Sequence, residues 1–360
     1  MTNTATKFES NWISPPGETI ADFLEERGWS QNELSQRIGY SRKHINKIIG
    51  GEASIGEELA LKLENVTGAS AHFWLERESN YREALARRAE EEYLKENVDW
   101  LRELPVADMV KFGWISKRPT KWEQVKEFLS FFGVASRESW IKQYSFVEAA
   151  FRKTNKFETD HGSTVAWLRK GEIEAQRIDC QPYSAKKFES SLRSLRSLTL
   201  NTNPAEFCEQ LVSTCAECGV AVVFVPTPSK CPASGATKWL SSEKALLMLS
   251  LRHKTDDHLW FSFFHEAAHI VLHAKRTVFF ELEGLDTSDE READEYAARM
   301  LIPEEYVAQT LQVSPSYSGV EALARELGIS PGIVVGYLQH HGVVPWSHLN
   351  KCKVRYCWVE

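Results

Sequence analysis

The clearest candidate for a reactive site in this chain is a pair of histidines four residues apart, with a glutamate directly after the first. They lie in the apolar run Phe263-Phe264-His265-Glu266-Ala267-Ala268-His269-Ile270-Val271. On a helix, His265 and His269 lie about 40° apart on one face, so both imidazoles can reach one metal ion. Glu266 then lies beside the open coordination position, where a carboxylate can take a proton from a metal-activated water. The pattern predicts a zinc hydrolase helix; the alternative is two partly exposed helix residues.

A catalytic zinc needs a third protein ligand, and acidic residues crowd the segment from 281 to 294. Apolar periodicity predicts a helix from Thr287 to Leu301, which Pro303 ends soon after. In this register Glu290 and Asp294 are four residues apart. Glu290 can therefore bind the metal while Asp294 accepts the other ring N–H of a ligand histidine.

Other roles are open for the residues near this third ligand. The segment Thr287-Ser288-Asp289-Glu290 also fits a capping box, in which the Glu290 side chain would serve the helix start. Glu292 is the second candidate for the ligand. His273, one turn after His269, is interpreted as a helix-face residue, because the glycine and longer spacing of the third-histidine motif are absent.

Together the two segments resemble the ImmA/IrrE family of metallo-endopeptidases. The resemblance rests on His265-Glu-Ala-Ala-His269 followed by Glu290-Arg-Glu-Ala-Asp294-Glu-Tyr-Ala-Ala-Arg-Met-Leu-Ile-Pro303. It implies a gluzincin-like site with zinc on His265, His269 and Glu290. It also implies Glu266 as the general base and Asp294 as a supporting residue. Short strands predicted at Val220 to Val225 and Ala245 to Ser250 suit the small sheet of such a domain.

The first part of the chain, from Glu18 to Thr67, contains four short amphipathic segments between turn residues. This arrangement predicts a helix-turn-helix, with a capping box at Ser30-Gln31-Asn32-Glu33, a turn at Gly39 and a cap at Ser41. The third segment is the candidate recognition helix. Its outer side chains can hydrogen-bond base edges or phosphates in a major groove, and they are Arg42, Lys43, Asn46 and Lys47.

Charge restricts where DNA could bind. Between Ser30 and Gly50 four basic residues stand against one acid, a local charge of +3, whereas the whole chain has a formal net charge of −7. DNA binding would therefore be local to this patch. The alternative is a small helical protein-interaction module with a solvated basic face.

Residues from Pro15-Pro16-Gly17-Glu18 through Phe73-Trp74-Leu75 resemble the Xre-type domain of the HigA family of antidote repressors. The resemblance implies a homodimer that binds a double-stranded DNA operator. It also implies that Gln31 contacts phosphate and that Arg42, Lys43 and Asn46 lie near bases.

We expect a mostly α, α+β protein with a helix-turn-helix bundle, a helical middle domain and a small gluzincin-like domain with a short β-sheet. The expected divisions are 1–80 for DNA binding, 81–194 for the middle or coupling domain, 195–345 for the peptidase and 346–360 for a C-terminal tail or edge strand. The middle segment is too apolar for a flexible linker. Its predicted helices are Tyr81 to Asn97, Trp122 to Phe132, Glu138 to Lys153 and Ser163 to Gln176. A second helix-turn-helix pattern, Gly319 to Gly336, is poor in outer Lys and Arg, so we expect it to pack on the peptidase domain.

The seven cysteines point to a reducing compartment, since we find no secretory leader in Met1 to Trp12 and no apolar run near 18 residues. We therefore expect a cytoplasmic protein without a membrane span. The lone Cys215-Ala-Glu-Cys218 fits a helix of small buried residues better than a zinc site.

These patterns predict a transcriptional regulator whose zinc domain cleaves a partner protein, a repressor or an antitoxin, with metal-activated water. Glu266 would activate the water and later protonate the leaving amine. Tyr296, His253 and His258 are unranked candidates for the oxyanion donor. The alternatives are a non-catalytic antitoxin or phage-type repressor with a sensing zincin domain, and a component of a toxin–antitoxin pair.

Overall fold

The computed structural model describes residues 13–151, 161–273, 279–281 and 287–358. The chain divides into two compact units, Met1–Asn97 and Val98–Glu360. The predicted class is confirmed, because the described parts of both units are mostly helical and include one small sheet, in the second unit. The boundaries predicted at residues 80, 194 and 345 stay predictions. The predicted leader, Met1 to Trp12, lies outside the described residues.

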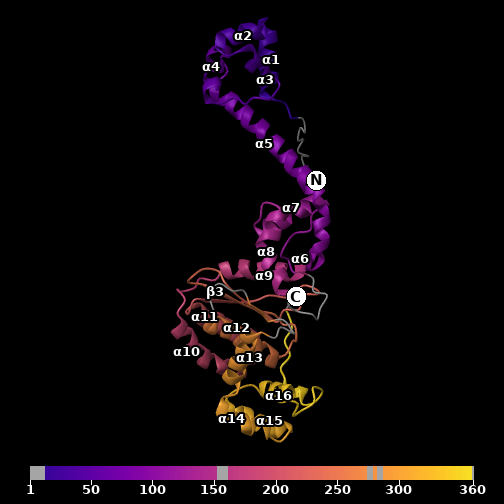
Figure 1. Ribbon diagram of the computed structural model, residues 1–360, viewed down its shortest axis with the longest axis vertical. Coiled ribbons are helices and arrows are strands. Elements are labelled where there is room, and N and C mark those ends of the chain that lie inside the picture. The colour runs from indigo at the N-terminus through magenta and orange to yellow at the C-terminus, as the bar shows by residue number, and fades with distance from the viewer. Residues whose placement is uncertain (1–12, 152–160, 274–278, 282–286, 359–360) are drawn as a thin grey trace, which may run out of the picture. The chain divides into compact units, whose positions relative to one another are not determined.

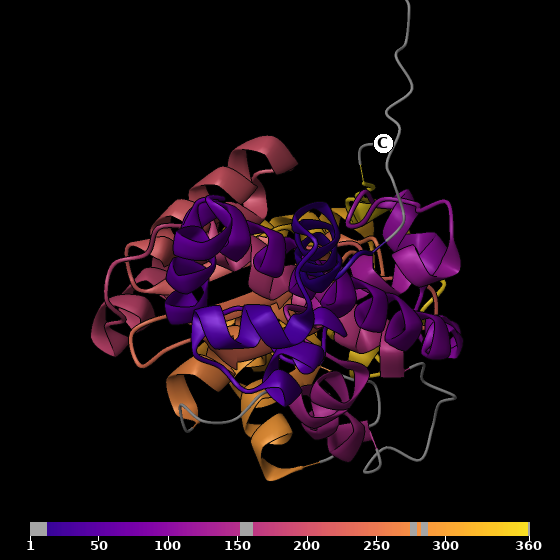
Figure 2. The same ribbon diagram turned by 90° about the horizontal axis from the view of Figure 1, so that it is seen from above.

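Four short helices and one long helix build the first unit, and Figures 1 and 2 show the short ones in indigo to purple. They are α1 (Pro16–Arg27), α2 (Gln31–Ile38), α3 (Arg42–Ile49), α4 (Glu57–Thr67) and α5 (Ala71–Glu96). Ser30 and Ser41 cap α2 and α3, accepting hydrogen bonds from the backbone N–H groups of Glu33 and His44. The capping box predicted at Ser30 is only half formed, because the Glu33 carboxylate pairs with Arg37. Between them Gly39 adopts the left-handed conformation, with φ at 76°.

One core holds these helices together, formed by one apolar stripe from each. Its fully enclosed members include Ile20, Leu34, Ile45, Leu63 and Trp74. Trp74 belongs to α5, which Ser70 caps, so this helix begins ten residues before the predicted Tyr81. The first turns of α5 are therefore part of the helix-turn-helix core.

The second unit begins with an aromatic helical layer. Its elements are η1 (Val98–Glu103), α6 (Val106–Lys111), α7 (Lys121–Phe132), α8 (Arg137–Phe151) and α9 (His161–Gln176). The next two elements, α10 (Ala185–Leu195) and η2 (Arg196–Leu200), belong to the core around the sheet. Trp100, Phe132 and Trp140 pack against one another, with ring centroids 5.4 to 6.2 Å apart. Buried Trp167 on α9 donates a hydrogen bond to Val225 O at 3.0 Å and so attaches this layer to the sheet region. The end predicted for α8, Lys153, lies outside the described residues.

The sheet has four strands in the order β1-β3-β2-β4. They are β1 (Val220–Phe224), β2 (Gly235–Trp239), β3 (Ala245–Leu249) and β4 (Phe279–Glu281), and α11 (Pro204–Ala216) precedes them. β1 runs parallel to β3, while β2 is antiparallel to both β3 and β4. β1 and β3 were predicted. β2 and β4 were not, because Gly-Ala-Thr-Lys-Trp has no apolar run and β4 has only three residues.

The remaining helices include one that is buried for most of its length, α12. They are α12 (Asp256–Leu272), α13 (Ser288–Leu301), α14 (Glu304–Leu311), α15 (Tyr317–Leu327), α16 (Pro331–His340) and η3 (Asn350–Cys352). Phe263 and Phe264 of α12 share a core with Leu247 of the sheet and Val334 of α16. The second helix-turn-helix pattern, α15 and α16, is thus part of this core.

The C-terminal tail pairs with the start of α12. An isolated β-bridge joins Thr255 to Arg355, and Asp256 N donates to Val354 O at 3.0 Å. The tail is therefore not a further strand of the sheet. Among the described residues, no helix is long and apolar enough to cross a bilayer.

Candidate metal centre

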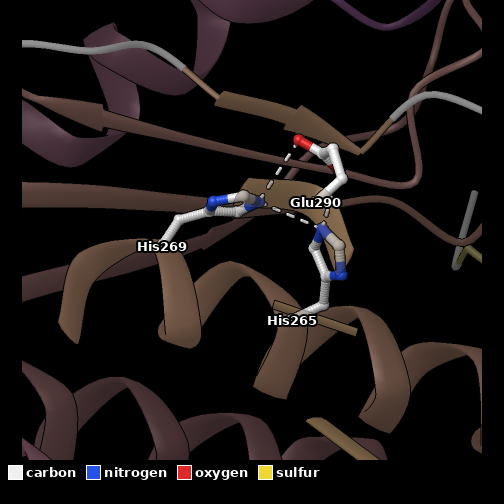
Figure 3. A group of neighbouring side chains, drawn as sticks. All are labelled: His265, His269 and Glu290. Atoms are coloured by element: carbon white, nitrogen blue, oxygen red, sulfur yellow. Dashed lines mark hydrogen bonds and ion pairs between the residues drawn. The ribbon is translucent and has the colours of Figure 1, made fainter. Parts of the chain in front are cut away.

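Three side chains from α12 and α13 converge on one point (Figure 3). The Nε2 atoms of His265 and His269 are 3.1 Å apart. The Glu290 carboxylate lies 3.2 Å from His265 Nε2 and 3.5 Å from His269 Nε2. The three ligand atoms all lie within 4.8 Å of one another. Two imidazole nitrogens and one carboxylate oxygen are a donor set that suits zinc.

The environment keeps His269 in the form that binds metal. His265 and His269 are almost completely buried. Burial, together with the neighbouring His265 and His273 rings, lowers the pKa of His269 from 6.5 to about 2. A neutral imidazole offers its lone pair to a cation without first losing a proton. The residues present therefore fit a bound zinc ion.

Glu290 contributes its backbone N–H to the cap of α13 and its carboxylate to the histidine cluster. Its backbone N–H donates to Thr287 Oγ1 at 3.3 Å, as a capped helix requires, while its carboxylate faces the histidines. Glu292 lies elsewhere: its side chain is 65% exposed, and its carboxylate lies 3.5 Å from His273 Nε2. The structure therefore brings Glu290, and not Glu292, to the histidine pair.

Each histidine of the pair has a partner for its second ring nitrogen. Asp294 Oδ1 lies 2.8 Å from His265 Nδ1, which orients the Nε2 lone pair toward the cluster. His269 Nδ1 lies 2.9 Å from His273 Nδ1. With the His269 Nε2 lone pair facing the cluster, its Nδ1 carries the proton and donates to His273. His273 is thus the residue after α12 that supports His269, a role its i, i+4 spacing from His269 could have indicated.

Glu266 is held between α12 and β2. It is fully buried, and Thr237 Oγ1 donates a hydrogen bond of 2.5 Å to its carboxylate. A Cβ atom at Gly235 would lie 2.6 Å from the same carboxylate, so only glycine fits there without displacing Glu266. Gly235 and Thr237 were not predicted as site residues, because β2 itself was not predicted.

A cleft of about 600 Å³ reaches the cluster from one side. His265, Glu290 and Asp294 line it, whereas Glu266 and His269 are not among its described lining residues. Of the three candidate oxyanion donors, His253 and His258 line the cleft with their rings stacked 4.2 Å apart. Tyr296 does not; it packs against the hydrophobic core.

In the first unit, the outer face of α3 carries the predicted DNA-contacting side chains. Ile45 and Ile48 of this helix face the core. The exposed side chains on its outer face are Arg42, Lys43, Asn46 and Lys47. Ser41 is occupied as the cap, and Gln31 is half-buried at the start of α2. Arg37 is engaged locally, 2.7 Å from Glu33 and stacked over the Trp29 ring at 4.1 Å. The basic patch of α3 therefore consists of Arg42, Lys43 and Lys47.

Comparison with known families agrees with both halves of this description. Residues 20–74 match a family model described as helix-turn-helix, and residues 229–336 match one described as IrrE N-terminal-like domain. The chain thus joins a helix-turn-helix domain of the Xre type to an IrrE/ImmA-like domain of a metallopeptidase family, and the two resemblances seen in the sequence are confirmed.

Two similar solved structures are small proteins. A Pseudomonas aeruginosa protein in complex with its operator DNA is 29% identical, over 22% of this chain and 85% of that one, with a TM-score of 0.21. An addiction module antidote protein of the HigA family from Coxiella burnetii is 25% identical, over 23% of this chain and 92% of that one, with a TM-score of 0.22. A search of curated proteins gave no match.

Proposed function

We propose that this chain is a DNA-binding transcriptional regulator whose IrrE-like domain is a zinc-dependent endopeptidase acting on a partner protein, a repressor or an antitoxin. The observation that carries the proposal is the convergence of His265, His269 and Glu290 within 4.8 Å at the end of a cleft. A structural zinc site has four protein ligands, whereas a catalytic one has three and an open position. The cluster provides three, and the HExxH glutamate lies beside the first histidine.

The proposed chemistry is metal-assisted peptide hydrolysis. A zinc ion in this cluster would supply the Lewis acidity that makes water nucleophilic near neutral pH and polarises a carbonyl. Glu266 takes the proton of the attacking water and delivers it to the leaving amine. Thr237 orients the Glu266 carboxylate through the 2.5 Å hydrogen bond. His253 and His258, on the cleft wall, are the donors that we assign to the developing oxyanion.

The proposed role of the first unit is to bind an operator as a homodimer in the cytoplasm. The outer face of α3 presents three cations and the Asn46 amide, none of which forms an ion pair or side-chain hydrogen bond among the described residues. These groups are therefore available to phosphates and base edges. The net charge of −7 favours contact through this face alone.

A second candidate function is a regulator in which the zinc domain senses a ligand without turnover. The observation that favours it is the enclosure of Glu266, which is 0% exposed and outside the described lining of the cleft. A base that takes a proton from water has to reach that water. In this candidate, metal or ligand binding at the cluster would change DNA affinity.

Co-expression with the products of neighbouring genes separates the two candidates. New protein N-termini would be mapped by mass spectrometry for the wild type, Glu266→Gln and the control Glu292→Gln, whose side chain is exposed. The peptidase proposal expects one product to be cut by the wild type and by Glu292→Gln but not by Glu266→Gln, with zinc bound in all three. Zinc in all three without any cleavage would favour the sensing regulator.

A further inference from the structure

We propose that Trp346, with Tyr337 and Phe261, forms a subsite of the cleft that takes a large apolar, preferably aromatic, side chain of the peptide substrate. The inference rests on the proposed peptidase function and adds a substrate class to it. Trp346, Tyr337 and Phe261 line the same cleft of about 600 Å³ as His265 and Glu290. A peptide bound in this cleft can therefore place one side chain among the three rings and a peptide bond at the metal cluster.

Trp346 is unlike most large aromatic side chains of this chain. Its side chain is 61% exposed, whereas Trp74, Trp100, Trp167 and Trp260 are at most 1% exposed. An indole left in water forgoes the burial that stabilises the others, and ring surface of this kind is typical of binding sites.

The backbone around Trp346 is fixed, so the exposure of its ring is built into the fold. The carbonyl oxygen of Trp346 accepts hydrogen bonds from Asn350 Nδ2 at 2.8 Å and from Gln339 Nε2 at 3.4 Å. Gln339 is itself buried, and its Oε1 accepts from Lys353 Nζ at 2.7 Å. Lys353 also contacts Asp257 at 2.6 Å. The turn that presents the indole is thus attached to α16 and, through Lys353, to the start of α12.

The rest of the lining favours an uncharged ring over other side chains. Tyr337 stacks on His341 with ring centroids 4.1 Å apart, and Leu301 and Ile333 add aliphatic surface. The acids that line the cleft are Asp257, Glu290, Asp294 and Glu295, while the described lining includes no Lys or Arg. An acidic substrate side chain would be repelled. The Lys353 ammonium, which is paired with Asp257, already lies over the indole ring at 6.0 Å from its centroid and takes the cation–π position there.

Phe261 belongs to the segment that matches the IrrE-like family model, residues 229–336, whereas Tyr337 and Trp346 follow that segment. Tyr337 and Trp346 are therefore features of this chain's own C-terminal segment. We infer that this segment, and not the common metal-binding helices, sets the side-chain preference.

Binding of peptide hydroxamates to the zinc-loaded full chain tests the subsite without relying on turnover. Two series would be used, with the variable residue before or after the metal-chelating hydroxamate and with Phe, Leu, Ala, Glu or Arg at that position. Affinities would be measured by calorimetry for the wild type, Trp346→Ala, Trp346→Phe and the control Trp358→Ala. Trp358 is also exposed and in the tail, but it is not a lining residue of the cleft.

The subsite lies on one side of the metal cluster, so we expect the preference in one of the two series only. In that series the Phe compound should bind about 10-fold more tightly than the Ala and Glu compounds. Trp346→Ala should remove this preference, while Trp346→Phe and Trp358→Ala keep it, with zinc content unchanged throughout. Zinc binding with no Phe preference, a preference that survives Trp346→Ala, or tightest binding of the Arg compound would overturn the subsite and leave the peptidase proposal standing. Absence of zinc from the wild type would overturn both.

Discussion

Asp256 and Asp257, neighbours at the start of α12, should respond to substitution by asparagine in opposite directions. Asp256 is fully buried, and its carboxylate accepts hydrogen bonds from Ser330 Oγ at 2.5 Å and Val354 N at 3.0 Å. Burial raises the pKa of Asp256 from 3.8 to about 6. Asp257 instead forms an ion pair with Lys353 at 2.6 Å, with both side chains at most 7% exposed.

Because the pKa of Asp256 is raised, the effect of Asp256→Asn on stability should depend on pH. A carboxyl group whose pKa is higher in the folded state contributes stability that is fully present below pH 3.8 and lost as the pH rises through about 6. The shift in the pKa of Asp256 corresponds to a loss of about 3 kcal/mol in the free energy of unfolding at neutral pH. The N-terminus of α12 stabilises a negative charge and offsets about 0.3–1 kcal/mol of this loss. The amide oxygen can still accept from Val354 N, and the amide nitrogen can donate to Ser330 Oγ once that hydroxyl turns; the amide cannot ionise. As the pH rises from 4 to 7.5, the free energy of unfolding of Asp256→Asn should therefore increase by about 2 kcal/mol relative to that of the wild type.

Asp257→Asn should be destabilising instead. It removes the negative charge beside Lys353, whose ammonium would keep Gln339 Oε1 at 2.7 Å. Leaving one charge of a buried pair without its counter-charge costs about 3–5 kcal/mol. We expect this loss throughout pH 5 to 8.

Urea unfolding of the full chain at several pH values, followed by circular dichroism, would measure both effects. Hydrogen–deuterium exchange of peptides from α12 would assign the transition to the second unit. A constant destabilisation by Asp256→Asn at every pH would refute the reasoning about its burial. A neutral Asp257→Asn would refute the importance of the pair with Lys353.

Three further predictions concern the candidate sites. Asp294→Asn and His273→Ala should each weaken zinc binding about 10–100-fold in competition with a chelating dye, and unchanged affinity would show that these contacts do not support the ligands. Gly235→Ala should keep stoichiometric zinc yet lose cleavage, because the new Cβ displaces the Glu266 carboxylate; cleavage at the wild-type rate would contradict this. Lys47→Ala should lower the slope of log affinity against log salt for random duplex DNA by about 0.9, and an unchanged slope would exclude Lys47 as a phosphate contact.

The sequence predicted those parts of the candidate site that local periodicity determines. His265 and His269 lie on one face of α12 because of their i, i+4 spacing. The register of α13 likewise places Glu290 and Asp294 on one side. The same reasoning predicted the caps of α2 and α3 and the exposed face of the latter.

Other parts depend on contacts between segments far apart in the chain, on which periodicity has no bearing. Thr237 lies 29 residues before Glu266 and reaches it only because β2 packs against α12. Trp346 enters the cleft because Gln339 and Asn350 hold its carbonyl group. His273 is a different case: its spacing was visible, but we compared it with a ligand motif and did not consider a supporting role.

Zinc content of the purified full chain, measured for the wild type, Glu290→Gln and the matched variant Glu292→Gln, tests the central claim most directly. The account predicts one zinc ion per chain in the wild type and in Glu292→Gln, and none in Glu290→Gln. A wild type without zinc, or a Glu290→Gln variant that retains it, would contradict the assignment of His265, His269 and Glu290 as the metal centre.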